Sequence, residues 1–206
     1  MTRARRARSW HRQHAADHFT HRAFEEGWRS RAVYKLEELD RRDHLFRTGM
    51  RVLDVGATPG GWSQYAAKSV GGAGEIIALD ILPMQPLSRV EFVQVDFRDD
   101  SALQHLLQKL RSRRVNLVMS DMAPNLTGVM AIDQPRAMDL AERSLQLARE
   151  SLKQGGDFVV KLFQGEGFSA YVSLVRQSFG KVALRKPGAS RSQSREVYVV
   201  AKNYRL

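Results

Sequence analysis

Short apolar runs alternate along the chain with segments whose apolar residues recur every three or four positions. The short runs are rich in β-branched and aromatic residues, which is the pattern of buried strands, and the longer segments have the period of amphipathic helices. The predicted strands are Val52–Val55, Gly74–Asp80, Val90–Asp96, Val115–Asp121, Gly156–Phe163, Lys181–Arg185 and Arg195–Ala201. The predicted helices are Arg31–Phe46, Trp62–Val70, Ser101–Arg111, Pro135–Leu152 and Phe168–Phe179.

Strands that alternate with helices predict an α/β fold, with a mostly parallel seven-stranded sheet and helices on both faces. The segment Lys181–Arg185 is expected to pair with the last strand as a hairpin. A chain of 206 residues suits one domain with a proper core. We therefore expect a basic N-terminal arm over residues 1–28, mobile at its start, and a single domain over residues 29–206.

The charge distribution points to a polyanionic partner. The formal net charge is +11, and the basic side chains form an N-terminal and a C-terminal group. These are Arg3, Arg5, Arg6, Arg8, Arg12, Arg22, Arg29 and Arg31, and then Arg185, Lys186, Arg191 and Arg195. Clustered basic residues neutralise phosphates and release their counterions, so an RNA-binding face is favoured over a charge that merely aids solubility.

Other features of the composition exclude several classes of protein. There is no cysteine, hence neither a disulfide framework nor a thiolate metal site. No apolar run approaches membrane-spanning length, and the basic start is not followed by the apolar segment of a secretory signal, so we expect a cytoplasmic protein. His11, His14, His18 and His21 share a helical spacing. No cysteine or carboxylate completes a ligand set with them, and we expect no metal.

The segment Arg51–Tyr65 predicts a strand, a glycine loop and the start of a helix, as in the first unit of a nucleotide-binding α/β domain. Gly56, Gly60 and Gly61 would let the backbone turn sharply and approach a ligand, although glycines at a strand end are also ordinary turn residues. The loop reads G-A-T-P-G-G and lacks the G-x-G-x-x-G spacing that cradles a pyrophosphate. A nucleoside ligand without a pyrophosphate is therefore favoured.

Three predicted strands end in an acid, at Asp80, Asp96 and Asp121. Ligands of open parallel sheets bind beyond the carboxyl ends of the strands, so these acids and the glycine loop should line one crevice. Asp80 would accept hydrogen bonds from ribose hydroxyls and Asp96 from an adenine amine, while Trp62 would offer an apolar or stacking surface. S-adenosylmethionine fits this set, although each acid alone could instead cap a helix.

Lys161 interrupts the apolar strand Gly156–Phe163. A lysine in a central strand is costly unless its ammonium is paired or functional, whereas on an edge strand it could reach solvent. Asp121 should end the neighbouring strand, so the two side chains could pair. Glu196 begins the last apolar strand and Lys35 lies on the helix before the glycine loop, but spacing alone does not bring these four residues together.

Several segments resemble the FtsJ/RrmJ (RlmE) family of ribosomal RNA ribose 2′-O-methyltransferases, in unbroken order from about Arg29 to the C-terminus. They read RSRAVYKLEEL, LDVGATPGGWSQY, VQVDFRD, VMSDMAPNLTG, DQPRAMDL, FVVKLFQGEGF and SRSQSREVYVVA. Thr58 stands where the family usually has a smaller residue, and the N-terminal arm matches poorly. The resemblance implies a Rossmann-like S-adenosylmethionine-dependent methyltransferase fold.

The resemblance also implies the site residues and the substrate. A Lys-Asp-Lys-Glu tetrad would fall on Lys35, Asp121, Lys161 and Glu196, and cofactor contacts on Gly60, Trp62, Asp80, Asp96 and Asp121. The expected substrate is a uridine ribose in the A-loop of 23S ribosomal RNA on the large ribosomal subunit, with Lys161 taking the proton of the 2′-hydroxyl. We expect a monomer. The alternatives are a methyltransferase for another acceptor, a non-catalytic RNA-binding ribosome-assembly factor and, more distantly, a nicotinamide dehydrogenase.

Overall fold

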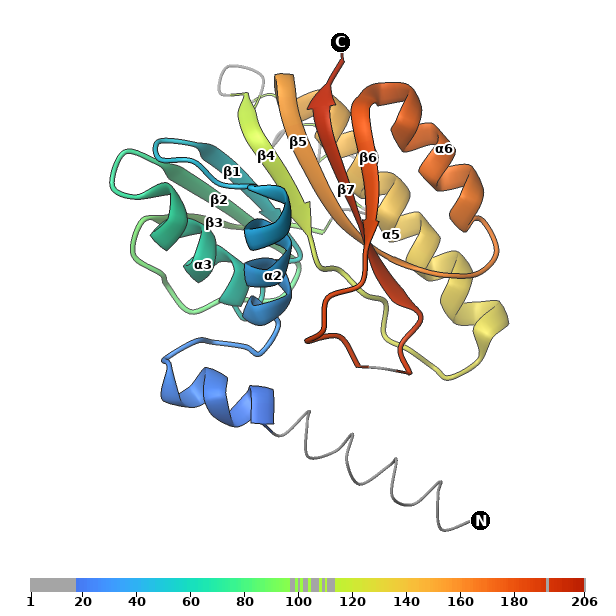
Figure 1. The fold of residues 1–206 in the computed structure, drawn as a ribbon, viewed down its shortest axis with the longest axis horizontal. Helices are drawn as coiled ribbons and strands as arrows, with labels where there is room; N and C mark the ends of the chain where they lie inside the picture. Colours follow the sequence, from blue (N-terminus) through green and yellow to red (C-terminus); the bar gives the residue numbers. More distant parts are fainter. Residues whose placement is uncertain are drawn as a thin grey trace.

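A computed structural model describes residues 18–96, 99, 101, 104, 108, 110, 114–191 and 193–205. It contains one seven-stranded sheet in the order β3-β2-β1-β4-β5-β7-β6 (Figure 1). The strands are β1 Arg51–Val55, β2 Glu75–Asp80, β3 Val90–Gln94, β4 Val115–Ser120, β5 Leu152–Phe163, β6 Phe179–Arg185 and β7 Glu196–Tyr204. Neighbouring strands from β3 to β5 are parallel, whereas β7 runs antiparallel to β5 and β6. The predicted mostly parallel sheet and its final hairpin are confirmed.

Helices cover both faces of this sheet, as the alternating pattern predicts (Figure 1). Their bounds are α2 Val33–Asp43, α3 Gly61–Val70, α5 Met130–Ser151 and α6 Phe168–Ser178. Buried residues of α2 and α3, among them Leu36 and Trp62, pack on one face of the sheet. Buried residues of α5 and α6, among them Leu145 and Tyr171, pack on the other. The helix predicted at Ser101–Arg111 lies largely outside the described residues.

The first residues of α5 and β5 differ most from the sequence prediction. Helix α5 begins at Met130, five positions before Pro135. The carboxylate of Asp133 accepts hydrogen bonds from the backbone N–H groups of Thr127 and Gly128, which fixes the turn that leads into this helix. Strand β5 begins at Leu152, which pairs with Val115 before the register shifts. A glycine pair inside the strand hid this early start from the sequence pattern.

The described part of the N-terminal arm is folded, and the predicted mobile start of the arm lies outside the described residues. Residues 18–25 are helical. Ala23 of this helix is buried with Val33 and Tyr34 of α2, and the ring of Phe19 lies 5.4 Å from that of Tyr34. The helix therefore packs against the domain. His11 and His14 lie outside the described residues, and no group of metal-binding side chains occurs within the described ones.

Candidate active site

The glycine loop connects β1 to α3 at the carboxyl edge of the sheet. Gly56 has φ +76° and Gly60 has φ +109°, a region of conformation that side chains disfavour. A Cβ on Gly56 would lie 2.2 Å from Cγ of Met122, so the loop packs tightly against the segment after β4. Helix α3 starts at Gly61 without a side-chain cap. Its first N–H groups therefore form a cradle suited to an anion such as a carboxylate.

Asp80, at the end of β2, closes the base of this cradle. Its carboxylate accepts a hydrogen bond from the N–H of Thr58 (2.8 Å) and another from the N–H of Leu82 (2.8 Å). A carboxylate offers about four acceptor positions, so Asp80 keeps capacity for ribose hydroxyls. Asp96 lies two residues beyond the end of β3, the strand next to β2, and the N–H of Val95 donates to the carbonyl of Asp80 (2.8 Å). The two acids expected to contact the nucleoside thus lie on adjoining segments, as predicted.

Trp62 is placed differently from the sequence interpretation. Its side chain is 3% exposed, its indole N–H donates to the carbonyl of Ala32 (2.8 Å), and its ring lies 5.9 Å from that of Tyr198. The ring therefore packs between α2 and the sheet and offers no open stacking surface. A contact from this residue to a ligand would come from its backbone in the first turn of α3.

The alternation of side chains along β5 and β7 brings the tetrad residues to one face of the sheet. On β5, Val159 packs with the α2 and α3 core, whereas Phe158, Val160 and Leu162 pack with α5 and α6. Lys161 lies two positions from Val159, so it shares the α2 face. On β7, Tyr198 and Val200 belong to the same core, which places Glu196 on that face as well. Lys161, the charged residue within this central strand, therefore lies on the α2 side of the sheet, where Lys35 also lies.

The four predicted residues form two ion pairs. Lys161 Nζ lies 3.0 Å from Asp121 Oδ1 and also donates to the main-chain carbonyl of Asp121. Lys35 Nζ lies 2.8 Å from Glu196 Oε1. The Lys161 side chain is 7% exposed, so its ammonium is largely removed from water. Removing the charges of such a buried ion pair from water costs free energy. Buried ion pairs are therefore more typical of functional sites than of sites that only stabilise the fold.

Tyr198 links the two pairs and was not among the residues predicted from the sequence. Its hydroxyl donates to Asp121 Oδ1 (2.5 Å), and Lys35 Nζ lies 5.7 Å from the centre of its ring. Burial, followed by the negative charge of Asp121, raises the pKa of Tyr198 well above 10, so the hydroxyl keeps its proton and stays a donor. It lies directly opposite Lys161 in the antiparallel β5–β7 pairing, and that register has no local sequence signal.

Glu196 is held in its charged form. Burial alone would raise its pKa, but the charge and hydrogen bond of Lys35, with smaller contributions from Ser190 and Lys161, outweigh burial and lower the pKa below its ordinary value. An ionised Glu196 keeps the Lys35 ammonium in place.

Asp54 is a second residue that sequence reasoning did not assign to the site. It lies on β1, is 1% exposed, and accepts a hydrogen bond from the hydroxyl of Ser63 on α3 (2.6 Å). Burial raises its pKa to about 7; the Ser63 hydrogen bond opposes this, whereas the charges of Asp121 and Asp80 add to it. The only sequence signal was an acid inside an apolar run immediately before the glycines.

The chain matches the family model described as FtsJ-like methyltransferase over residues 28–204. The chain belongs to the FtsJ-like methyltransferase family. Two curated relatives are named Ribosomal RNA large subunit methyltransferase E. The one from Chromohalobacter salexigens is 55% identical over 95% of this chain and 93% of its own length, and the one from Legionella pneumophila is 49% identical over the full length of both chains. The predicted family is therefore confirmed.

Solved structures agree with the FtsJ-like methyltransferase fold. A ribosomal RNA methyltransferase structure from Plasmodium falciparum has a TM-score of 0.76 and 27% identity, over 86% of this chain and 98% of that one. Human methyltransferase-like protein 13 in complex with SAH has a TM-score of 0.56 at 14% identity, over 78% of each chain, and shows the fold alone. Within the described residues, no helix is both long and apolar enough to span a bilayer.

Proposed function

We propose that this FtsJ-like methyltransferase uses S-adenosylmethionine to methylate the 2′-hydroxyl of a uridine ribose in the A-loop of 23S ribosomal RNA on the large ribosomal subunit. The observation that carries the proposal is the meeting of the pairs Lys161–Asp121 and Lys35–Glu196 beside the glycine loop. The names of the two curated relatives support large-subunit ribosomal RNA as the substrate class. The nucleotide itself rests on the family resemblance.

The residues around the glycine loop suit the methyl donor. When bound, S-adenosylmethionine supplies an activated methyl group on a sulfonium. The uncapped N–H groups at the start of α3 would hold its carboxylate, and Asp80 would accept from its ribose hydroxyls. Asp96, on the segment beside Asp80, would accept from the adenine amine.

Lys161 is the proposed proton acceptor. Asp121 contacts Lys161 Nζ through its carboxylate and its main-chain carbonyl, which fixes where the amine points. A lysine can accept a proton only as the neutral amine, so the reactive fraction loses a proton to solvent first. The 2′-hydroxyl proton would then move to Lys161 Nζ as the ribose oxygen bonds to the methyl carbon, and the methyl–sulfur bond would break to release neutral S-adenosylhomocysteine. Holding the hydroxyl in line for this attack lowers the barrier by several kcal/mol on its own.

A basic surface adjoins the tetrad and supports an RNA acceptor. Burial and, to a smaller extent, the repulsion of the positive charge of Arg191 lower the pKa of Arg31, whereas the charge of Glu196 opposes them. A phosphate between the two guanidinium groups would relieve that repulsion. Arg31 donates to the carbonyl of Ala189 (2.8 Å), and Gly188 donates to Glu38 (2.6 Å), so the loop before β7 is fastened to α2.

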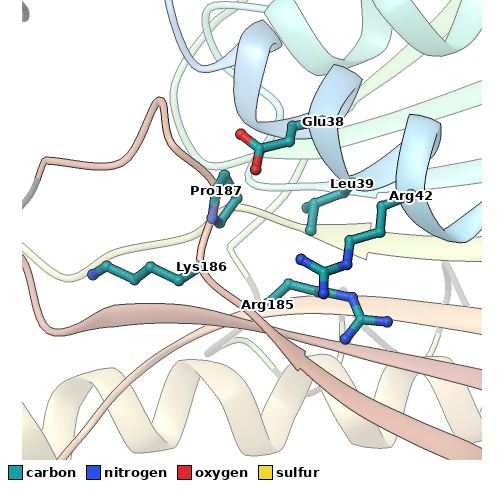
Figure 2. A pocket seen from close by; sticks show the side chains of 6 residues that line it. All are labelled: Glu38, Leu39, Arg42, Arg185, Lys186 and Pro187. Carbon is teal, nitrogen blue, oxygen red and sulfur yellow. The ribbon is translucent and has the colours of Figure 1, made fainter.

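Further cations line a shallow hollow between α2 and the end of β6. Figure 2 shows Arg42 and Arg185 beside each other, with the side chain of Lys186 directed away from them. Arg185 is paired with Asp43 (2.6 Å), whereas Arg42 is exposed. Lys186 donates to the main-chain carbonyl of Glu196 (2.7 Å), which connects this hollow to the tetrad. The arrangement suits an RNA backbone that passes from α2 toward the reacting ribose.

A methyl-transfer assay tests the proposal. Large subunits that lack the modification are incubated with tritium-labelled S-adenosylmethionine and the wild-type protein, Lys161→Ala or Lys153→Ala. Lys153 is an exposed lysine at the opposite end of the same strand and serves as the matched control. We expect the wild-type protein and Lys153→Ala to label 23S RNA, and Lys161→Ala to lose at least about three orders of magnitude in rate, as for removal of a general base together with its positioning.

The outcomes separate the alternatives. Tight binding of subunits without methyl transfer by the wild-type protein would favour a non-catalytic assembly factor. Transfer to another acceptor in preference to ribosomal RNA would refute the substrate. A near-wild-type single-turnover rate for Lys161→Ala would remove Lys161 from the proposed role.

A further inference from the structure

Arg29 bridges two chain segments that flank the proposed cofactor site. Its Nη1 donates to the carbonyls of Pro59 (3.2 Å) and Gln85 (2.6 Å), and its Nη2 donates to the carbonyl of Pro86 (2.7 Å). Pro59 belongs to the glycine loop. Gln85 and Pro86 belong to the segment that follows Asp80. One guanidinium therefore ties together the segments on either side of the nucleoside position.

The bridged segments also pack closely at Gly60. A Cβ on Gly60 would lie 2.8 Å from Cδ1 of Leu87, 3.0 Å from Sδ of Met84 and 3.2 Å from Cδ of Arg29. The segment 81–87 is therefore folded down on the glycine loop, with the stem of Arg29 beside it. At the base of the same two segments, Thr58 Oγ1 donates to the carbonyl of Leu82 (3.2 Å). Thr58 secures the segments near the sheet, and Arg29 secures them further along the chain.

Arg29 is itself held in place from the domain core. Its backbone N–H donates to Oε1 of Gln64 on α3 (2.7 Å), and Nε2 of the same glutamine donates to the carbonyl of Gly27 (3.1 Å). The guanidinium is thus anchored before any ligand arrives, which reduces the ordering that binding would require. The three acceptors also explain why the residue is arginine. A guanidinium presents five donors in a planar fork, whereas a lysine ammonium is a point charge on a flexible stem.

We propose that Arg29 is a positioning residue that holds segment 81–87 against the glycine loop and so pre-forms the site for the adenosyl group of the methyl donor. The inference rests on the proposed function, because it takes that group to be the ligand between these segments. Arg29 lies two residues beyond the N-terminal turn that ends at Gly27. The same side chain therefore also connects the folded N-terminal helix to the cofactor site.

Affinity for S-adenosylmethionine and S-adenosylhomocysteine, measured by titration calorimetry, tests this role. We expect Arg29→Ala to raise both dissociation constants at least about ten-fold, in line with the loss of several charge-assisted hydrogen bonds. Arg29→Lys keeps the charge and most of the stem, and we expect it to restore little of the affinity. The matched control is Arg176→Ala, an exposed arginine on α6. In turnover assays, KM for the methyl donor should rise while kcat at saturating donor stays within about two-fold of wild type.

Amide hydrogen exchange of the ligand-free protein gives a readout that does not depend on activity. Segment 81–87 should exchange faster in Arg29→Lys than in the wild-type protein, while the amides of β4 and β5 stay unchanged. If Arg29→Ala does not fold, Arg29→Lys decides the question. Unchanged affinity and unchanged exchange in Arg29→Lys would overturn the inference and leave the proposed function standing. A wild-type protein that does not bind either nucleoside would overturn both.

Discussion

Lys161 and Tyr198 lie opposite each other on the antiparallel strands β5 and β7, and both side chains reach the carboxylate of Asp121. Asp121 Oδ1 therefore receives a hydroxyl donor and an ammonium donor at once. Asp121 follows β4, which is a parallel neighbour of β5, so three adjacent strands contribute one residue each to this contact. The change of strand direction between β5 and β7 makes the arrangement possible, because the start of β7 meets the ends of β4 and β5 at one edge.

Removal of the Tyr198 hydroxyl should slow methyl transfer without weakening cofactor binding. Tyr198→Phe keeps the ring that packs on Trp62 but deletes the hydrogen bond to Asp121, which leaves that carboxylate freer to rotate away from Lys161. We expect a loss of about ten-fold in the single-turnover rate and about 1 kcal/mol in the free energy of unfolding. The control is Tyr204→Phe, which removes a hydroxyl bonded to the carbonyl of Arg149 at the far end of the same strand. Equal transfer rates for the two variants would show that Tyr198 does not position Asp121.

The fold could be predicted from the sequence because the spacing of apolar residues along the chain indicates which side chains are buried. Every strand with a continuous apolar run was found, and the polar break at Lys161 correctly marked a pairing with Asp121. The register of β5 and β7 was not predicted, since an antiparallel pairing over a long connection has no local sequence signal. Tyr198 was consequently missed, although it lies directly opposite Lys161 in that register.

The direction in which a side chain points also depends on contacts that lie far apart in the sequence. Trp62 follows two glycines at a predicted ligand loop, so its ring could point to the ligand or into the core. In the structure the ring points into the core, where the indole N–H donates a hydrogen bond to the carbonyl of Ala32. Similarly, the helix over residues 18–25 was not predicted, because its few apolar side chains pack against residues outside the segment, among them Tyr34 and Ala189. Contacts of this kind depend on tertiary packing and produce no periodic pattern of apolar residues in the local sequence.

The buried carboxyl of Asp54 should make stability fall as pH rises from about 4 to about 7. Burial raises its pKa to about 7 in the folded protein, whereas an unfolded aspartate titrates near 4. The folded state therefore binds more protons within this window. The contribution of Asp54 is fully present below about pH 4, declines as pH rises, and reaches a plateau above about 7, for a loss on the order of 4 kcal/mol.

Urea unfolding between pH 4.5 and 8 measures this contribution. Asp54→Asn keeps an oxygen that accepts from the Ser63 hydroxyl but cannot ionise, so its free energy of unfolding should depend less on pH than that of the wild-type protein. Asp139→Asn, on the surface of α5 where Asp139 pairs with Arg143, is the control and should follow the wild-type curve. Parallel curves for all three proteins would place the folded pKa of Asp54 close to its ordinary value.

Exposed arginines beside the tetrad should determine the salt dependence of RNA binding. Burial and the positive charge of Arg191, in the loop before β7, lower the pKa of Arg31, and Arg42 lines the hollow between α2 and β6 (Figure 2). If each contacts one phosphate, the double variant Arg191→Ala/Arg42→Ala should reduce the slope of log K against log salt by about 1.4 to 1.8, since each phosphate contact contributes about 0.7 to 0.9. The matched control removes Lys153 and Arg176, exposed cations on the first residues of β5 and the last turn of α6. The slopes are measured by filter binding of 23S RNA fragments at salt concentrations from about 50 to about 300 mM, where counterion release dominates the change in affinity. A control slope equal to that of the wild-type protein, with a smaller slope for the double variant, places the RNA backbone along α2 and the loop before β7; the reverse result would move the RNA to the opposite edge of the sheet and away from Lys161.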